Sequence, residues 1–219
     1  MNYQLDRYHQ PLNGDITLSS SKSESNRALI MNALSGNQLQ LKNLSDARDT
    51  QTMQRLLSKK QPVWDVIDAG TTMRFCTAYL AISGSGEIIT GSDRMKERPI
   101  KPLVDALRKL GAKIDYLAQE GFPPLRISAQ KNKPQADKIS IPGNISSQYI
   151  SALLMIGPTL ADGISIELTS EIFSRPYIEM TLALMHHFGI NSTWKDQTID
   201  IKPQPYKAQS YTIESDWSG

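Results

Sequence analysis

The chain has 219 residues, a formal net charge of +2, 39% hydrophobic residues and 21% charged residues. That length supplies a full hydrophobic core, in one domain of about 200 residues or in two small ones, and the charge is too low for a general nucleic-acid binder. The single cysteine, Cys76, excludes an intrachain disulfide and a cysteine-based metal cluster, which fits a reducing compartment.

The elements predicted along the chain repeat one plan, in which small or hydroxyl residues open an apolar helix, and a strand and a second helix follow. The first unit has its helix, strand and second helix at residues 23–34, 39–44 and 49–57. The second unit has the same elements at residues 75–82, 87–90 and 102–110. The third unit has them at residues 152–160, 165–168 and 178–188. We therefore interpret the chain as an array of related units.

Between Gly111 and Gln148 the pattern changes to the period of two that is typical of strands. The strands predicted there are residues 112–117, 125–128 and 138–141. Turn-forming residues 121–124 and the polar run 129–137 separate them. Each unit thus combines helices and strands with extra β-ribbon, and the sequence predicts an α/β (α+β) fold with pseudo-threefold repetition.

The two ends of the chain differ from this plan. Residues 3–18 precede the first unit and have no counterpart. Residues 211–219 resemble residues 139–147, which introduce the third unit, but no helix follows them. We expect the chain to be a piece of a longer protein that stops at Gly219; a natural C-terminus in a frayed turn is the alternative.

Clusters of hydrogen-bond donors stand where the three first helices begin, at residues 19–23, 70–72 and 146–148. Unpaired backbone N–H groups and a partial positive charge make a helix N-terminus favourable for an anion, although a single Ser or Thr there is often only an N-cap. Basic residues stand at equivalent ends of the repeated elements: Lys22, Arg27, Arg74, Arg98 and Arg175. Together, these features predict a site for a multiply anionic small molecule.

Five blocks closely resemble, in order, the motifs of the 5-enolpyruvylshikimate-3-phosphate synthase family: residues 21–29, 68–74, 95–100, 146–149 and 174–178. A Ser-Lys-Ser or an Arg-Pro alone carries no weight, but the five blocks span essentially the whole chain. The related enolpyruvyl transferase that acts on UDP-N-acetylglucosamine shares the repeat architecture. The Lys-Glu-Arg-Pro and Ser-Ser-Gln blocks favour the shikimate enzyme.

The resemblance implies an enzyme of two domains, each an inside-out α/β barrel of three βαβαββ units. One enolpyruvyl-transferase domain would be present here, at residues 19–214, with units at about 19–67, 68–142 and 143–214. Residues 1–18 would belong with the second domain, and residues 215–219 would begin the crossover to it. The intact protein is expected to be a monomer, and this chain to self-associate through the exposed domain face.

The resemblance also implies site residues. Lys22 would be catalytic and would contact the phosphates of both substrates. Shikimate 3-phosphate would contact Lys22, Ser23, Arg27, Ser146, Ser147, Gln148, Ser174 and Tyr177. Phosphoenolpyruvate would contact Lys22, Gly70, Arg98 and Gln148, where glyphosate competes in this family. Arg74 would support the Gly70 loop.

Two residues depart from the family pattern. Asp68 stands where many members have Asn, and Arg175 where many have Lys. Asp68 would place a negative charge near the anion pocket, or its side chain would cap the helix that begins nearby.

The implied reaction transfers the enolpyruvyl group to the 5-hydroxyl of shikimate 3-phosphate, without a metal or an organic cofactor. The family takes its proton-transfer Asp and Glu from the other domain, so this chain is expected to be inactive alone. A non-catalytic anion-binding module is the alternative. No nucleic-acid or membrane partner is expected, and the absence of a membrane-length apolar segment or a secretory signal predicts a cytoplasmic location.

Overall fold

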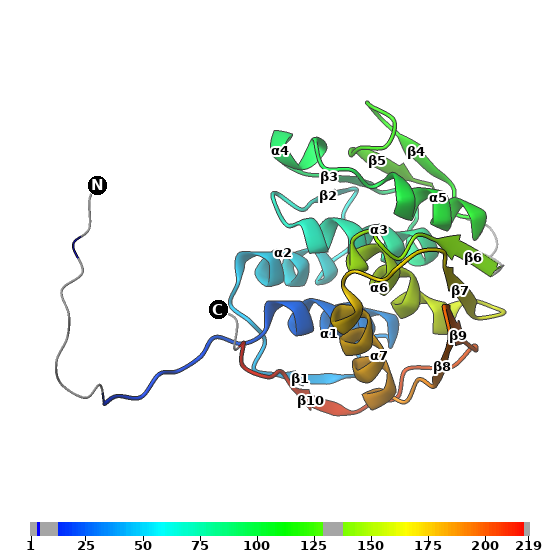
Figure 1. Ribbon diagram of the computed structural model, residues 1–219. Helices are drawn as coiled ribbons and strands as arrows, with labels where there is room; N and C mark the ends of the chain where they lie inside the picture. Colours follow the sequence, from blue (N-terminus) through cyan, green and yellow to red (C-terminus); the bar gives the residue numbers. More distant parts are fainter. Residues whose placement is uncertain (1–3, 5–12, 129–137, 217–219) are drawn as a thin grey trace.

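The structure is a computed structural model that describes residue 4, residues 13–128 and residues 138–216 (Figure 1). Three helices lie side by side at its centre: α1 (Lys22–Leu34), α3 (Gly70–Ser83) and α6 (Ser147–Ile156). α3 is buried at every residue from Gly70 to Ala78, including Cys76, and most of α6 is buried too. Because a helix that is buried on all sides needs neighbours on all sides, these helices form the core and the remaining elements surround them.

Three outer helices each cover one groove between two central helices. They are α2 (Arg48–Leu57), α5 (Lys101–Lys109) and α7 (Arg175–His187). α2 contacts α1 and α3, α5 contacts α3 and α6, and α7 contacts α6 and α1. This arrangement confirms the predicted pseudo-threefold repetition. Two short helical segments, α4 (Asp93–Lys96) and the 3₁₀ turn η1 (Gly157–Thr159), complete the helical elements of the described residues.

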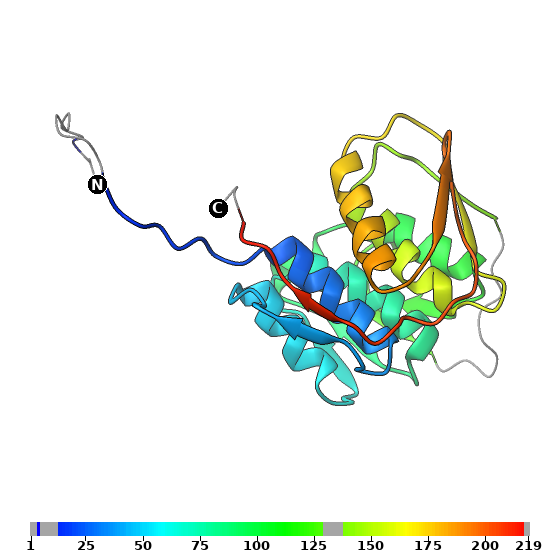
Figure 2. The same ribbon diagram turned by 90° about the horizontal axis from the view of Figure 1, so that it is seen from below.

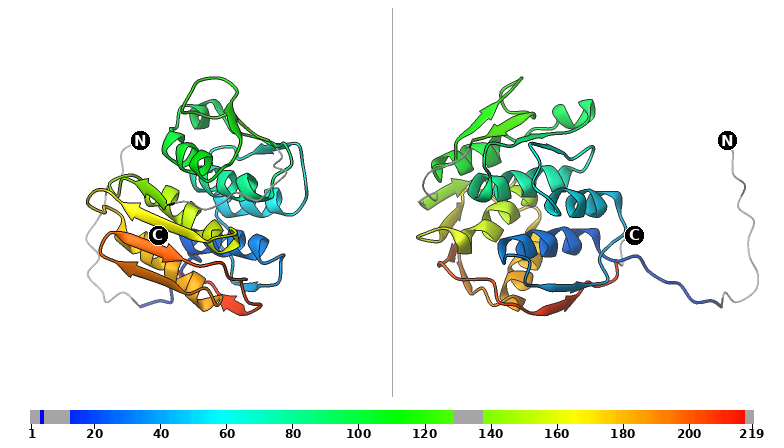
Figure 3. Two further views of the ribbon diagram at one scale, coloured as in Figure 1. Left: turned by 90° about the vertical axis from the view of Figure 1, so that its right-hand side faces the viewer. Right: turned by 180° about the vertical axis from the view of Figure 1, so that it is seen from behind.

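The strands lie on the outside (Figure 3) and, over the described ranges, form two four-stranded sheets and one two-stranded sheet. One sheet has the order β2-β3-β5-β4, with bounds Val63–Asp65, Ile88–Thr90, Leu125–Ile127 and Ile114–Tyr116. The other has the order β6-β7-β9-β8, with bounds Lys138–Ile141, Ile164–Leu168, Thr198–Ile201 and Ser192–Lys195. In both, the first two strands are parallel and the last two form an antiparallel hairpin. Each sheet with its helices is therefore one βαβαββ unit.

The first unit is assembled from the two ends of the chain. β1 (Gln40–Lys42) pairs in parallel with β10 (Ser210–Thr212), in the register that places Leu41 opposite Tyr211. Ser20 and Ser215 form a further antiparallel bridge beside this pair. β10 thus takes, next to β1, the position that β2 and β6 take in their own sheets, although about 170 residues separate the two strands.

The sheets divide the chain differently from the predicted unit boundaries. Residues 63–65, which form β2, fall within the predicted first unit at 19–67, yet β2 pairs with β3 of the second unit. Likewise β6 pairs with β7, and β10 with β1. The repeat in the sequence is clearest at the helix starts, so the predicted units were divided there. In the structure, the strand before each first helix pairs in parallel with the strand after it. Each structural unit therefore begins one strand before the predicted boundary.

Most predicted elements are present, with shifted ends. α3 and α6 begin at Gly70 and Ser147, before the predicted starts at residues 75 and 152, because the polar residues that open them are helical. Strands β2, β8 and β9 were not predicted. Residues 13–18 of the N-terminal segment 1–18 lead away from the body without secondary structure (Figure 2), and residues 1–3 and 5–12 of that segment lie outside the described residues.

Glu24, in the first turn of α1, fixes β10 to the central bundle. Its carboxylate accepts a hydrogen bond from the Tyr211 hydroxyl and another, of 2.7 Å, from the Glu214 backbone N–H. Burial and the bond to Glu24 raise the pKa of Tyr211, so its hydroxyl stays protonated and donates. The backbone N–H of Ser21 in turn donates to the Glu214 carbonyl at 2.9 Å. The start of α1 and the end of the chain are therefore one hydrogen-bonded assembly.

We expect Glu24→Gln to loosen β10 while the rest of the fold stays intact. The amide nitrogen of glutamine cannot accept a hydrogen bond, so one of the two hydrogen bonds, from the Tyr211 hydroxyl or from the Glu214 N–H, is weakened. This lowers the local stability of β10 by about 1 kcal/mol. Hydrogen exchange should then accelerate about fivefold at the amides of β10 and not in α6. Uniform acceleration over the whole chain would contradict the local role of Glu24.

No helix among the described residues combines the length and the apolar character needed to cross a lipid bilayer.

Candidate anion-binding site

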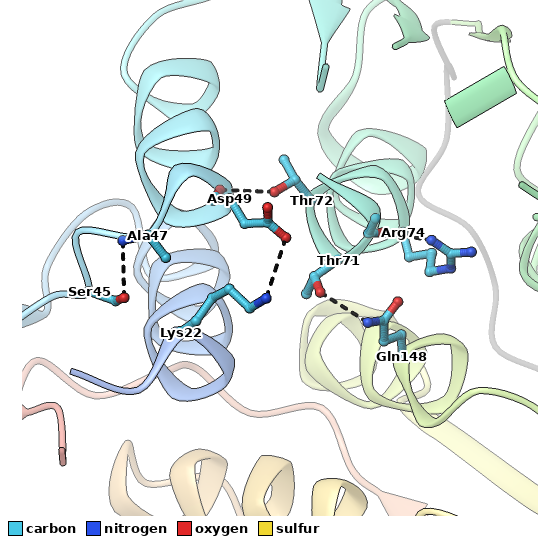
Figure 4. Close-up of polar contacts among 9 residues, drawn as sticks. Lys22, Ser45, Ala47, Asp49, Thr71, Thr72, Arg74 and Gln148 are labelled. Carbon is cyan, nitrogen blue, oxygen red and sulfur yellow. Dashed lines mark hydrogen bonds and ion pairs between the residues drawn. The ribbon is translucent and has the colours of Figure 1, made fainter. Parts of the chain in front are cut away.

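The N-termini of α1, α3 and α6 gather at one end of the central bundle (Figure 4). Gln148 Nε2, at the start of α6, donates a 3.0 Å hydrogen bond to Thr71 Oγ1, at the start of α3. Lys22 Nζ, at the start of α1, lies 4.0 Å from Asp49 Oδ2, and Thr72 Oγ1 donates to the Asp49 carbonyl at 3.1 Å. Three partial positive charges of about half an electron thus meet in one place. This arrangement agrees with the anionic site that the sequence predicts.

Side chains cap two of these helices and leave the third open. Ser21 Oγ accepts from the Glu24 N–H, and Ser146 Oγ accepts from the Gln148 N–H. α3 follows Ala69 and has no side-chain cap. Its first backbone N–H groups are therefore the ones best suited to meet a ligand oxygen.

Arg98 covers the open start of α3. A Cβ atom added to Gly70 would lie only 2.7 Å from Arg98 Cζ, so the guanidinium occupies the space that a side chain would fill. Partial burial and the positive charges of Arg74 and Arg94 lower the pKa of Arg98, and Asp49 opposes this shift. A bound anion would relieve the repulsion between Arg98 and these neighbouring arginines, so the surroundings of Arg98 favour anion binding.

Asp49 is a site residue that sequence analysis missed, since it was predicted only as the start of a second helix. It lies in the first turn of α2, where a carboxylate is stabilised by the helix dipole. Its ion pair with Lys22 is half-exposed and contributes little to stability. Its main effect is to offset part of the positive charge of Lys22 and Arg98 when no anion is bound.

The predicted residues of α6 and α7 differ in accessibility. Ser146 is exposed, Ser147 is buried and Gln148 is half-buried at the start of α6. Ser174 is half-buried just before α7, where it makes no cap hydrogen bond. The Tyr177 ring is 44% exposed and lies 5.7 Å from Arg27 Cζ, so α7 presents it beside α1.

Arg27 is held inside the protein, with 2% of its surface exposed. Its Nε donates to Thr181 Oγ1 at 2.7 Å, its Nη1 to the Ser23 carbonyl at 2.8 Å and its Nη2 to Ser151 Oγ at 3.2 Å. Burial lowers its pKa to about 10, which still leaves it charged at neutral pH. The guanidinium therefore joins α1, α6 and α7, and its predicted role as a carboxylate ligand stays a prediction.

The two departures from the family pattern make contacts of their own. Asp68 does not cap α3, as one alternative held; it accepts a hydrogen bond from Ser92 Oγ, the N-cap of α4. Arg175 was expected among the basic residues of the anionic site. Instead, its Nε donates to Glu179 at 2.8 Å, and its Cζ lies 4.5 Å from the Trp194 ring centre. Neighbours on α7 and β8 thus hold Arg175 by a helical ion pair and a cation–π contact.

In the part of the chain that the structure describes, no group of three or more His, Cys, Asp or Glu side chains is placed to hold a metal ion.

Comparisons with known proteins show the family of the chain. The family model described as EPSP synthase (3-phosphoshikimate 1-carboxyvinyltransferase) matches residues 7–60 and 56–219. A 3-phosphoshikimate 1-carboxyvinyltransferase of Bacteroides fragilis (strain YCH46) is 52% identical over all 219 residues, which span 53% of its length. The enzyme of that name from Histophilus somni (strain 2336) is 39% identical over 94% of this chain and 55% of its own length.

A solved structure of EPSP synthase from Acinetobacter baumannii has a TM-score of 0.78 at 17% sequence identity, covering 93% of this chain and 50% of that one. At that identity the match shows the fold alone, and it confirms the predicted α/β class. The chain spans about half the length of the curated relatives it matches. With both family-model matches covering nearly all of its residues, the chain belongs to the EPSP synthase (3-phosphoshikimate 1-carboxyvinyltransferase) family.

Proposed function

We propose that this chain is the shikimate 3-phosphate-binding half of an enzyme that transfers the enolpyruvyl group of phosphoenolpyruvate to the 5-hydroxyl of shikimate 3-phosphate. The observation that carries the proposal is the convergence of α1, α3 and α6 on Lys22, Arg98 and Gln148. Both substrates carry a phosphate and a carboxylate, and a cluster of helix N-termini with mobile cations suits such ligands.

The two substrates would occupy neighbouring parts of this site. Ser146 and Ser147 at the start of α6, with Ser174, would receive the 3-phosphate, and Tyr177 would lie against the ring. Ser23 and Arg27 would hold the shikimate carboxylate. Gly70 and Arg98 would receive the phosphate of phosphoenolpyruvate. Gln148 would contact both substrates, because its side chain already bridges α6 to α3 through Thr71.

Lys22 is the proposed catalytic residue of this half. Its side chain is 48% exposed beside Asp49, so the ammonium group can turn toward either phosphate. In the proposed reaction the 5-hydroxyl oxygen gives up its proton and adds to C2 of phosphoenolpyruvate, and the methylene carbon of phosphoenolpyruvate gains a proton. The tetrahedral adduct then loses phosphate from C2 and a proton from the new methyl group, which restores the double bond. Lys22 and Arg98 would stabilise the phosphate that leaves.

The groups that move protons would come from the part of the relatives that this chain does not span. General acid–base help contributes about 10²–10⁴-fold, so we propose that the chain alone binds substrate without turning it over. No metal or organic cofactor enters this scheme, and we propose a cytoplasmic location for the intact enzyme.

A calorimetric titration with shikimate 3-phosphate tests the binding role. We expect saturable heat from the native chain and about tenfold weaker binding for Lys22→Met, which removes the charge but keeps the length of the side chain. Lys59→Met, in an exposed position after α2, is the matched control and should bind like the native chain.

Two outcomes would contradict the proposal. One is the absence of saturable heat at millimolar ligand. The other is equal affinity for shikimate 3-phosphate and inorganic phosphate, which would favour a non-catalytic anion-binding module.

A further inference from the structure

We propose that Arg74 and Tyr149 are positioning residues that hold Arg98 beside Gly70 by donating hydrogen bonds to the Pro99 carbonyl oxygen. The inference rests on the proposed role of Arg98 as a phosphate ligand. Both residues are at least nine-tenths buried, and their side chains donate to the backbone carbonyls of Gly70 and Pro99.

The geometry converges on the peptide that follows Arg98. Tyr149 Oη donates to the Pro99 carbonyl at 2.6 Å, and Arg74 Nη2 donates to the same oxygen at 3.2 Å. A carbonyl oxygen has two lone pairs, so these two donors saturate it. Arg74 Nη1 also donates to the Gly70 carbonyl at 2.8 Å. Arg74 therefore joins, through one rigid guanidinium, the two backbone segments that must keep their distance for Arg98 to cover Gly70.

The two donors also fix each other. Arg74 Cζ lies 5.4 Å from the centre of the Tyr149 ring, in a cation–π contact that burial strengthens. Before Pro99, the backbone N–H of Arg98 donates to the Met95 carbonyl at 3.1 Å. After Pro99, the Ile100 N–H donates to the Gly121 carbonyl at 2.9 Å. The backbone on both sides of Arg98 is thus anchored, which leaves only its side chain free to adjust.

The positive charges of Arg74 and Arg98 explain why an anchored backbone would help Arg98 to bind an anion. Burial and the positive charge of Arg74 lower the pKa of Arg98, so the two like charges repel each other, and the anchored backbone opposes a displacement of Arg98. Fixing it in advance removes part of the ordering entropy that an anion would otherwise have to overcome on binding. Among the described residues, the Arg74 guanidinium donates to the Gly70 and Pro99 carbonyls, and its buried Nε has no hydrogen-bond partner.

Tyr149→Phe tests the proposal, because it deletes one hydroxyl and keeps the ring under Arg74. We expect the affinity for phosphoenolpyruvate, measured with shikimate 3-phosphate present, to fall about 3- to 10-fold, the size of one net hydrogen bond. The affinity for shikimate 3-phosphate should stay unchanged. Arg74→Lys keeps the positive charge but cannot donate to the Gly70 and Pro99 carbonyls at once. This variant should also bind phosphoenolpyruvate more weakly and shikimate 3-phosphate as the native chain does. Tyr79→Phe, at the far end of α3, is the matched control and should change neither affinity.

A second readout is independent of any ligand. Nitrogen-15 relaxation of the Arg98 Nε–H group in the free chain should report an ordered side chain, and Tyr149→Phe should lower its order parameter. If the native chain binds neither substrate but the order parameter still falls, the proposed function fails and the positioning role stands. An unchanged order parameter in Tyr149→Phe, or an equal loss of affinity for both substrates, would overturn the positioning role.

Discussion

Replacing Arg27 by alanine should lower the free energy of unfolding by about 3 kcal/mol or more, the largest loss expected from any single residue of the site. The guanidinium bonds to Thr181, Ser151 and the Ser23 carbonyl, and lies between the rings of Phe75 and Tyr177. Its removal would leave a polar cavity between three helices, with buried oxygens that lose their strongest donor.

Urea denaturation measures this effect through the shift of the midpoint at a constant slope. Arg27→Lys should recover less than half of the loss, because an ammonium group cannot reach three acceptors in different directions. Arg55→Ala, on the exposed face of α2, is the matched control and should cost less than about 1 kcal/mol. Equal midpoints for the Arg27 and Arg55 variants would contradict the account of Arg27 as the link between α1, α6 and α7.

Gly70→Ala should have the largest effect on ligand binding. The new methyl group would enter the space held by the Arg98 guanidinium, and would stand beside the uncapped N–H groups of α3. Because Arg98 is the end of a flexible side chain, it can move aside at little cost in stability. We expect phosphoenolpyruvate to bind about 100-fold more weakly, since charge-assisted hydrogen bonds contribute about 1.5–3 kcal/mol.

The selectivity of that loss is the informative part. Shikimate 3-phosphate should bind Gly70→Ala almost as it binds the native chain, because its proposed phosphate ligands stand on α6 and α7. Gly14→Ala, in a position where an added Cβ would meet nothing within 4 Å, is the matched control and should change neither affinity. Native-like binding of phosphoenolpyruvate by the Gly70 variant would remove Gly70 and Arg98 from the site.

Local sequence patterns located the polar segments at which the central helices open, because the signals lie within a few residues of each other, although they placed the first residues of α3 and α6 too late. Ser21 and Ser146 cap their helices, and Gly70 opens α3. The same patterns could not reveal that Arg27 is buried, since its partner Thr181 is 154 residues away. Whether an arginine is a ligand or a link between helices depends on such distant partners, and spacing along one helix does not reveal them.

The division into units shows the same limit in the backbone. The pairing of β1 with β10 joins residues at opposite ends of the chain, so no window of sequence contains it. The likeness of residues 211–219 to residues 139–147 nevertheless indicated an equivalent strand. β10 pairs in parallel with β1, as β6 pairs in parallel with β7, so both are first strands of a unit. Arg175 was misjudged for the opposite reason: it follows the repeat in sequence, but Glu179 and Trp194 hold it by contacts that the repeat does not specify.

The central claim is that the starts of α1, α3 and α6 form one site for the two substrates, with shikimate 3-phosphate at α1 and α6 and phosphoenolpyruvate at α3. Amide chemical shifts recorded by NMR, during a titration with shikimate 3-phosphate and then with phosphoenolpyruvate, test it most directly. The account predicts saturable changes at residues 21–23 and 146–148 with the first ligand and at residues 70–72 with the second, and none around the cavity at the other end of α1, which is lined by Ser35, Pro158 and Gln204. Changes centred on that cavity, or no change in any of the three segments at saturating ligand, would contradict it.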